Sequence, residues 1–473
     1  MSKEVSQEKE SKNHKFYDIA LEIINGKGGG WYVYSLQEDY IYSYENGYWK
    51  QIFDIELIDR LETSMEFLTK FPMPLKEQIV KQFKYKKYLR LDGFNSFPLI
   101  NFMNYMYDPL GNNVLAHNPT HYSTIRIPYN YTKAATCELW LKTLNEILEN
   151  DKDKIEILQE FIGYCLTADN EQKKALLLLG DTDTGKSTII DIFRELIGDV
   201  NCSNVPLQYL SNPQYTPLLI NKMVNIDPEV SKNAVEYERE FKLITGGKNE
   251  KVSCNQKHIP TFEFTPRCKL LLSANIFPKI TDHSSAFYQR LIVIPCNRRF
   301  LEHEKNRNLH TLLREELPGI FNWACQGLWR FKERGRFKQY DFAVEAVEEL
   351  EDENNPSNLF FKEHVEIVKG VEIEKGELYD KYKNWSEKNK QYPLSNSRFS
   401  MVLYKKYHTH TPKDTKNNVT NKRVWKNLQY VHFKNNNIKQ EEINWQDVPA
   451  VAIIKTLSPT TIKADSQQDI IWG

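Results

Sequence analysis

Residues 176–188 read LLLLGDTDTGKST, an apolar run that leads directly into the pattern GxxxxGK[ST]. Gly180 and Gly185 let the backbone turn so that successive N–H groups point at phosphate oxygens. Lys186 supplies a positive charge for the β- and γ-phosphates, and the Ser187 hydroxyl is a ligand for Mg²⁺. The residues after the loop are apolar at helical spacing, so we expect a helix whose positive end faces the phosphates. The residues expected to bind ATP are Gly180, Asp181, Thr182, Asp183, Thr184, Gly185, Lys186, Ser187 and Thr188.

The composition is that of a large folded protein. The chain has 473 residues, too many for one hydrophobic core, so several domains are expected. Lys+Arg and Asp+Glu both number 63, so any surface for nucleic acid must be local. The seven cysteines show no CxxC pair, which argues against a zinc site or disulfide framework and for a reducing compartment. Without a long apolar run or a signal peptide, we expect no membrane contact and a cytoplasmic location.

Polar residues follow two further apolar runs beyond the loop. Residues 223–226 lead to Asp227 and Glu229, and carboxylates at this point can hold Mg²⁺ and orient or deprotonate the attacking water. Residues 269–274 end at Asn275, whose amide can hold the same water or detect the γ-phosphate. On its own, an acidic residue after an apolar run is also typical of a strand that simply leads into a turn. When both runs follow a phosphate loop, their polar ends predict the catalytic residues of a nucleotidase.

Basic residues mark two other places. Arg290 stands just before the apolar run 291–295, where a lone arginine is usually a surface charge but can also reach a neighbouring subunit's γ-phosphate. In other nucleotidases such arginines raise the rate of nucleotide hydrolysis on the order of 10³–10⁵-fold. Residues 248–258 read KNEKVSCNQKH and predict a polar hairpin. Its basic residues, expected to bind DNA, are Lys248, Lys251, Lys257 and His258.

This series of motifs resembles that of superfamily 3 helicases, the AAA+ motors of small viruses. The motifs are GDTDTGKST, VNIDPE, ITGGKNEKVSCNQKH, LLLSANIFP and AFYQRLIVIP, in that order. Segments within residues 100–131 and 158–164 are similar to those that precede the motor in phage and plasmid primase-helicases and in the poxvirus nucleoside triphosphatase. The likeness covers roughly residues 15–435. It implies an ATP- and Mg²⁺-dependent hexamer that moves along DNA.

The resemblance assigns roles at the nucleotide site residue by residue. Lys186 and Ser187 match the phosphate-loop residues, and Glu229 matches the acidic residue of the second motif, with Asp227 as its partner. Asn275 matches the sensor asparagine of the family.

The remaining motifs concern the neighbouring subunit and the DNA. Arg290 matches the arginine finger, and Lys257 with His258 matches the hairpin that grips single-stranded DNA in the central pore. Two positions depart from the family. Lys248 stands where an acidic residue is common, and Gln289 stands where a second arginine is often found, so the finger role rests on one arginine.

The segments before the motor are mixed in character. Residues 31–34 and 40–44 are β-prone, and Asn46-Gly47 predicts the tip of a hairpin. Residues 81–90 interleave basic and aromatic residues, a pattern that fits either a nucleic-acid face or an ordinary amphipathic helix.

The C-terminal third predicts a winged helix. We expect two helices within residues 359–390, a capped helix over 398–407, and a β-hairpin from 420–428 and 430–433. Residues 395–440 hold ten Lys or Arg and one acidic residue, a phosphate-binding footprint; an unused basic face is the alternative. Candidate base contacts are Asn396 and Arg398, and candidate phosphate contacts are Lys405, Lys406, Lys422 and Arg423.

We therefore expect an α/β protein: a P-loop AAA+ motor domain with a mixed α+β N-terminal domain and a C-terminal winged helix. The expected parts are a disordered tail (1–15), an N-terminal accessory domain (16–135), the motor (136–335), a linker (336–358), the winged helix (359–435) and a C-terminal tail (436–473).

The expected function is that of an ATP-dependent replicative DNA helicase of a phage, plasmid or other mobile element, self-loading at an origin. Its partners would be single-stranded DNA, origin double-stranded DNA, further copies of the chain, and a separate primase or host replication proteins. Primase activity is not expected, because no paired-carboxylate strand motif precedes the motor. Two alternatives stay open: an ATP-switched origin-binding initiator that does not unwind processively, and a small-molecule kinase, which the basic C-terminal region disfavours.

Overall fold

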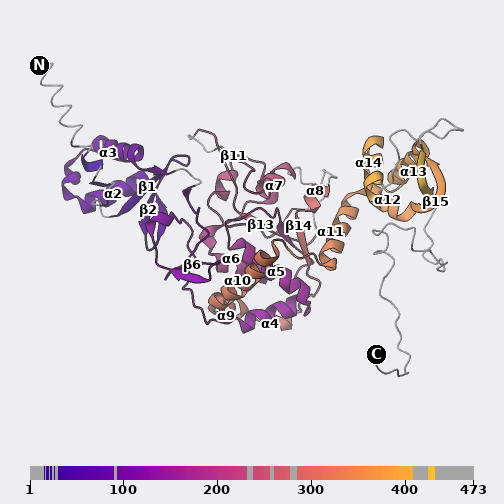
Figure 1. The fold of residues 1–473 in the computed structure, drawn as a ribbon, viewed down its shortest axis with the longest axis horizontal. Helices are drawn as coiled ribbons and strands as arrows, with labels where there is room; N and C mark the ends of the chain where they lie inside the picture. The colour runs from indigo at the N-terminus through magenta and orange to yellow at the C-terminus, as the bar shows by residue number, and fades with distance from the viewer. Residues whose placement is uncertain are drawn as a thin grey trace, which may run out of the picture. The chain divides into compact units, whose positions relative to one another are not determined.

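A computed structural model describes most of the chain. The described ranges are 30–89, 93–231, 238–255, 260–276, 285–407 and 424–431, with a few positions between 15 and 26. The two tails expected at 1–15 and 436–473 lie, apart from Lys15, outside these ranges. The chain divides into two compact units, Met1–Asn355 and Pro356–Gly473, whose elements are drawn in Figure 1.

The centre of the first unit is a parallel sheet of five strands in the spatial order β14-β8-β13-β10-β9. Leu177 of β8 pairs with Leu272 on one side and with Val293 on the other. All three are buried, as expected where both faces of a parallel sheet are covered. The apolar runs thus form the four predicted strands, which are β8 (Ala175–Leu179), β10 (Val224–Asp227), β13 (Lys269–Ala274) and β14 (Leu291–Pro295). The short edge strand β9 (Cys202–Ser203) was not predicted.

Successive side chains of β8 point into opposite halves of the core, as the two-residue period of a strand requires. Leu176 and Leu178 pack with one group of helices, and Ala175 and Leu177 pack with the other. Figure 1 shows α5, α6 and α10 gathered on one side of the strands. The first group is α4 (Glu138–Ile147), α5 (Lys152–Cys165), α6 (Lys186–Ile197), α9 (Leu309–Glu315) and α10 (Leu317–Arg334). The second is α7 (Glu238–Ile244), α8 (Ser285–Tyr288) and α11 (Asp341–Asn354).

Helices α5 and α10 approach each other through glycines. A Cβ at Gly163 would lie 2.4 Å from the carbonyl oxygen of Ala324, and one at Gly327 would lie 2.5 Å from that of Gln159. Carbon and oxygen atoms do not approach so closely, so the helices would have to separate. We expect Gly163→Ala and Gly327→Ala each to lower the free energy of unfolding by about 1–3 kcal/mol, measured by urea denaturation. Gly376→Ala is the control, because its Cβ would meet one side-chain oxygen at 3.6 Å; equal stability of all three variants would contradict the prediction.

The N-terminal part of the first unit carries a four-stranded sheet in the order β3-β2-β1-β4. The hairpin predicted at Asn46-Gly47 is confirmed: both residues have positive φ, as a type I′ turn requires. Phe83 is buried between this sheet and its helices, as in an ordinary amphipathic helix. The elements are β1 (Trp31–Ser35), β2 (Tyr40–Glu45), β3 (Tyr48–Ile52), α2 (Asp54–Ser64), α3 (Met73–Lys86), β4 (Tyr88–Leu89), β5 (Ile100–Asn101), β6 (Met106–Asp108) and β7 (Asn113–Leu115).

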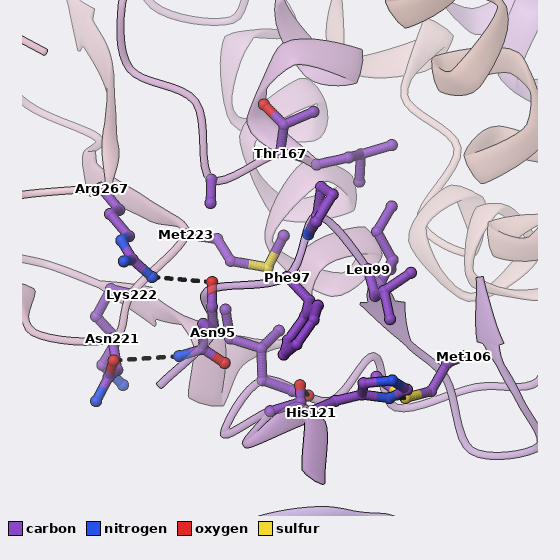
Figure 2. Close-up of a pocket in the computed structure, with 16 residues that line it drawn as sticks. Asn95, Phe97, Leu99, Met106, His121, Thr167, Asn221, Lys222, Met223 and Arg267 are labelled. Carbon is purple, nitrogen blue, oxygen red and sulfur yellow. Dashed lines mark hydrogen bonds between the residues drawn. The ribbon is translucent and has the colours of Figure 1, made fainter. Parts of the chain in front are cut away.

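Polar contacts join this N-terminal part to the part that carries the parallel sheet. Arg267 donates hydrogen bonds to the carbonyl oxygens of Phe94 and Asn95, at 2.8 and 2.9 Å. The side-chain amide of Asn95 donates to Asn221 at 3.1 Å. Figure 2 shows Arg267 and Asn221 bonded to Asn95 beside a small cavity, which His121 also lines. Its volume of about 40 Å³ has room for little more than water, so it cannot hold a nucleotide.

The described residues of the second unit form three helices and one pair of strands around an aromatic core. Phe360 and Phe399 lie fully buried in this core, with Trp425 from the last strand. Ser395 caps α14 through a 3.5 Å bond from the N–H of Arg398, as the sequence predicts. The elements are α12 (Pro356–His364), β15 (Val365–Glu374), α13 (Lys375–Lys388), α14 (Asn396–Tyr407) and β16 (Val424–Tyr430).

The two helices expected within residues 359–390 are present as α12 and α13, but the ten-residue strand β15 between them was not predicted. Its sequence VEIVKGVEIE favours a strand through its β-branched residues. One prediction for this unit is wrong. The expected hairpin of 420–428 with 430–433 does not form in the described residues. Instead, residues 424–430 make the single strand β16, which pairs antiparallel with β15.

Two further features concern the described residues as a whole. None of their helices is long and apolar enough to cross a membrane. All seven cysteines are free and buried.

Candidate nucleotide-binding site

The predicted loop connects β8 to α6 at the carboxyl edge of the parallel sheet. Gly185 has φ +84°, and a Cβ there would lie 2.7 Å from Ile147, so both conformation and space call for glycine. The Lys186 ammonium lies inside the loop and donates to the carbonyl oxygens of Gly180 and Asp181, at 2.6 and 2.5 Å. Burial lowers the pKa of Lys186, and the nearby Cys296 and Asp181 side chains oppose that shift. The loop therefore surrounds a cation with backbone groups.

A cavity of about 770 Å³ opens above this loop. Its volume falls in the range of pockets that hold a small-molecule cofactor. The strand order explains its place: from β8 the chain passes to β9 and β10 on one side and later to β14 on the other. Crevices at such a reversal are where open α/β sheets bind ligands. The lining residues are Leu139, Lys142, Thr143, Glu146, Ile147, Thr182, Asp183, Thr184, Gly185, Lys186, Ser187, Thr188, Pro228, Glu229, Ser273, Asn275, Phe300, Glu304, Lys305, Asn306 and Leu309.

Four of the predicted catalytic and metal-binding residues meet at this cavity: Lys186, Ser187, Glu229 and Asn275. Glu229 follows β10, and Asn275 follows β13, the strand that lies between β10 and β8. Because these strands are parallel, their carboxyl ends bring a carboxylate and an amide to the phosphate loop. The oxygen ligands present fit Mg²⁺ chemically.

Asp227 is placed differently. It ends β10, is 5% exposed, and accepts a 2.7 Å hydrogen bond from the backbone N–H of Leu207. Burial raises the pKa of Asp227, and the N–H groups of Leu207 and Glu229 oppose that shift. Asp227 is not among the residues that line the cavity, so of the predicted pair only Glu229 faces it.

Arg290 lies at the other end of the sheet. It precedes Leu291, which pairs with Ala175 at the start of β8, whereas the loop follows the end of β8. Five residues of strand separate the two places, roughly 16 Å. The Arg290 guanidinium donates to the carbonyl of Ala286 at 2.7 Å, and its Nε is buried without a hydrogen-bond partner. Burial lowers its pKa, with Glu250 opposing. Arg290 is therefore out of reach of the cavity in its own chain.

The structure describes the base of the predicted basic hairpin. Strands β11 (Val252–Cys254) and β12 (Phe262–Phe264) pair antiparallel, and Lys248 and Lys251 are exposed before β11. Lys248 forms a 2.7 Å ion pair with Glu171. The predicted DNA-gripping residues Lys257 and His258 lie outside the described residues.

The candidate DNA contacts of the second unit lie on or near α14. Asn396 and Arg398 are exposed at its start. Lys405 and Lys406 lie in its last turn, and their side chains are outside the described part of the structure. Lys422 and Arg423 lie entirely outside it.

Two walls of the cavity were not predicted. One is α4, which contributes Thr143 and Glu146; the other is the segment after β14, which contributes Phe300 and Lys305. Neither wall carries a motif, and both reach the loop only through tertiary packing. The charged residues of 298–305 were the only feature of the sequence there that could have indicated a polar binding site.

Comparisons with known proteins match two parts of the chain. Residues 23–149 match a family described as "D5 N terminal like", and residues 178–290 match a "Family of unknown function (DUF5906)". The second match starts within β8 and ends at Arg290, so it contains the loop, the hairpin and Asn275.

One curated relative is the putative helicase 121R of Invertebrate iridescent virus 3, which is 26% identical over 196 residues. The alignment covers 38% of this chain and 20% of the viral protein, so the chain spans only a small part of that relative's length. The chain is thus related in sequence to a viral protein named as a helicase.

Among solved structures, the apo C-terminal region (305–718) of NrS-1 has a TM-score of 0.50 at 13% identity, covering 87% of this chain and 98% of that one. Its A form has a TM-score of 0.48 at 14% identity, covering 83% and 86%. The first likeness shows that the mixed α/β fold of this chain is similar to that of the NrS-1 region.

Proposed function

We propose that this chain is an ATP-dependent DNA helicase of a phage, plasmid or other mobile element, with a superfamily 3 AAA+ motor. The observation that carries the proposal is the cavity that unites Lys186, Ser187, Glu229 and Asn275 at the carboxyl edge of the sheet. The placing of β13 between β8 and β10 supports the motor assignment, because it sets the sensor asparagine beside the phosphate loop. The sequence relation to a viral putative helicase supports the choice of helicase over other nucleotidases.

The cavity residues divide the chemistry among them. Lys186 would leave the loop carbonyls and meet the β- and γ-phosphates, and Ser187 with Glu229 would supply oxygens to Mg²⁺. The metal would neutralise charge that develops on the phosphates. Glu229 and Asn275 would orient the attacking water. Asp227 would act indirectly, by tying the end of β10 to the N–H of Leu207.

The proposed assembly is a hexameric ring. Arg290 cannot serve the cavity of its own chain, so in this proposal it reaches the γ-phosphate bound to the next copy. The hairpin β11–β12 would carry Lys257 and His258 into the central pore, onto single-stranded DNA. The order helix, strand, helix, helix, strand in the second unit supports a winged helix, with Asn396 and Arg398 facing origin DNA.

Lys257→Ala is expected to reduce strand displacement by at least about tenfold while ATP hydrolysis without DNA stays near the wild-type rate, because the lysine meets DNA phosphates and not the nucleotide. Lys50→Ala, which removes an exposed lysine of β3, is the control. A fluorescent forked duplex measures displacement. Normal unwinding by Lys257→Ala, in a protein whose ATP turnover depends on Lys186, would contradict the pore assignment.

The same assays separate the two alternatives. An ATP-switched initiator hydrolyses ATP and binds origin DNA but displaces no strand. A small-molecule kinase shows no stimulation of its ATP turnover by single-stranded DNA. The helicase proposal requires both stimulation and displacement.

A further inference from the structure

The phosphate-binding loop of this chain contains two acidic residues. Asp181 and Asp183 both stand within GDTDTGKST, and Asp183 lines the cavity. A carboxylate at this place repels an incoming triphosphate, because like charges a few ångströms apart repel each other even where water partly screens them. Offsetting this charge therefore favours the binding of phosphates.

A lysine from a distant part of the chain lies against Asp183. The Lys305 ammonium is 3.0 Å from Oδ1 of Asp183 and 2.9 Å from Oε2 of Glu302. Hydrogen bonds to the two carboxylates raise the pKa of Lys305, and the bond to Glu302 makes the larger contribution. The ammonium is therefore charged at neutral pH. Lys305 and Asp183 both line the cavity, whereas Glu302 does not and is 75% exposed. The Asp183–Lys305 pair therefore forms part of the cavity wall.

Hydrogen bonds to two backbone carbonyls hold the segment of Lys305 on the loop and on α4, independently of this ion pair. The backbone N–H of Phe300 donates to the carbonyl of Asp183 at 2.8 Å, and the Arg298 guanidinium donates to the carbonyl of Glu146 at 3.2 Å. Asp183 has φ +60°, a conformation that Asp and Asn tolerate better than other side chains with a Cβ. Changing Lys305 to Ala, or Asp183 to Asn, should therefore leave the wall in place.

We propose that Lys305 is a positioning residue of the nucleotide site, whose ammonium neutralises Asp183 so that the loop can accept a triphosphate. The inference rests on the proposed nucleotide-binding function. Lys305 acts through Asp183, and Lys186 remains the cation that meets the phosphates.

The test measures binding of a non-hydrolysable ATP analogue with Mg²⁺ by calorimetric titration of the full chain. Lys305→Ala is expected to weaken binding about tenfold, because it leaves Asp183 unpaired beside the phosphates. In an Asp183→Asn background the same change is expected to alter affinity by less than about twofold, since no charge is left to offset. Lys305→Arg keeps the charge and is expected to restore binding, and high salt is expected to shrink the loss.

Asp181→Asn is the matched control, because it removes the other loop carboxylate, which Lys305 does not contact in the described structure. In this background Lys305→Ala is still expected to cost about tenfold in affinity. Circular dichroism of each variant checks that the fold is kept.

Three other results would be decisive. An equal loss in the wild-type and Asp183→Asn backgrounds would show that Lys305 contacts the nucleotide itself, and would overturn the inference. An affinity unchanged by Lys305→Ala would overturn it too. If the wild-type chain does not bind the analogue at all, the proposed nucleotide-binding function fails first, and the same titration shows it.

Discussion

Lys186→Ala is expected to lower ATP turnover by at least about 10³-fold, because it removes the cation that the loop holds for the phosphates. In the structure this ammonium lies inside the loop, 2.6 Å from the carbonyl oxygen of Gly180. Steady-state phosphate release measures the rate. Analogue binding is expected to weaken as well, since the charge acts on the bound triphosphate.

Lys154→Met is the matched control for this experiment. Lys154 is also a buried lysine at the carboxyl edge of the sheet, and it donates to the carbonyl of Pro295 at 3.1 Å, but it does not line the cavity. We expect Lys154→Met to affect stability far more than turnover. A Lys186→Ala protein that folds and still hydrolyses ATP at the wild-type rate would contradict the phosphate-loop assignment.

Arg290→Ala is expected to lower ATP turnover on the order of 10³-fold while analogue binding is kept, because Arg290 would serve the transition state on the next copy. Mixing this variant with Lys186→Ala chains gives a sharper test of the shared site. In rings made from equal amounts of Arg290→Ala and Lys186→Ala chains, about a quarter of the interfaces join an intact loop to an intact arginine. We therefore expect the mixture to regain turnover that neither variant has.

Mixing Lys186→Ala with Asn275→Ala is the control. Both side chains line the same cavity, so each chain carries a damaged site of its own and no arrangement repairs it. Recovery in this control, or its absence in an Arg290→Ala mixture that does form joint rings, would argue against a shared site.

The sequence predicted the fold best where the signal is local. The strand, loop and helix around Lys186 follow from an apolar run, two glycines and helical spacing, all within about 25 residues. The hairpin at Asn46-Gly47 follows from turn chemistry alone. In the second unit, by contrast, the two helices expected within residues 359–390 are present, but the strand β15 between them was missed. Its partner β16 begins fifty residues after β15 ends, so no local pattern indicates the pairing.

The same limit applies to the candidate site. Glu229 and Asn275 were predicted because each follows a recognisable apolar strand, and parallel strands bring their ends together. The orientation of Asp227 could not be predicted, because it depends on the N–H of Leu207, twenty residues earlier in the chain. Lys305 carries no motif, and its place beside Asp183 results from the fold of the segment after β14.

The central claim is that ATP is hydrolysed between identical copies around a DNA strand. Its most direct test is the mass of the wild-type chain in solution, by light scattering, with a non-hydrolysable ATP analogue, Mg²⁺ and single-stranded DNA. We expect a closed assembly of about six times the 55.8 kDa of one chain. A protein that remains a single chain under these conditions, and yet hydrolyses ATP at its full rate, would contradict it.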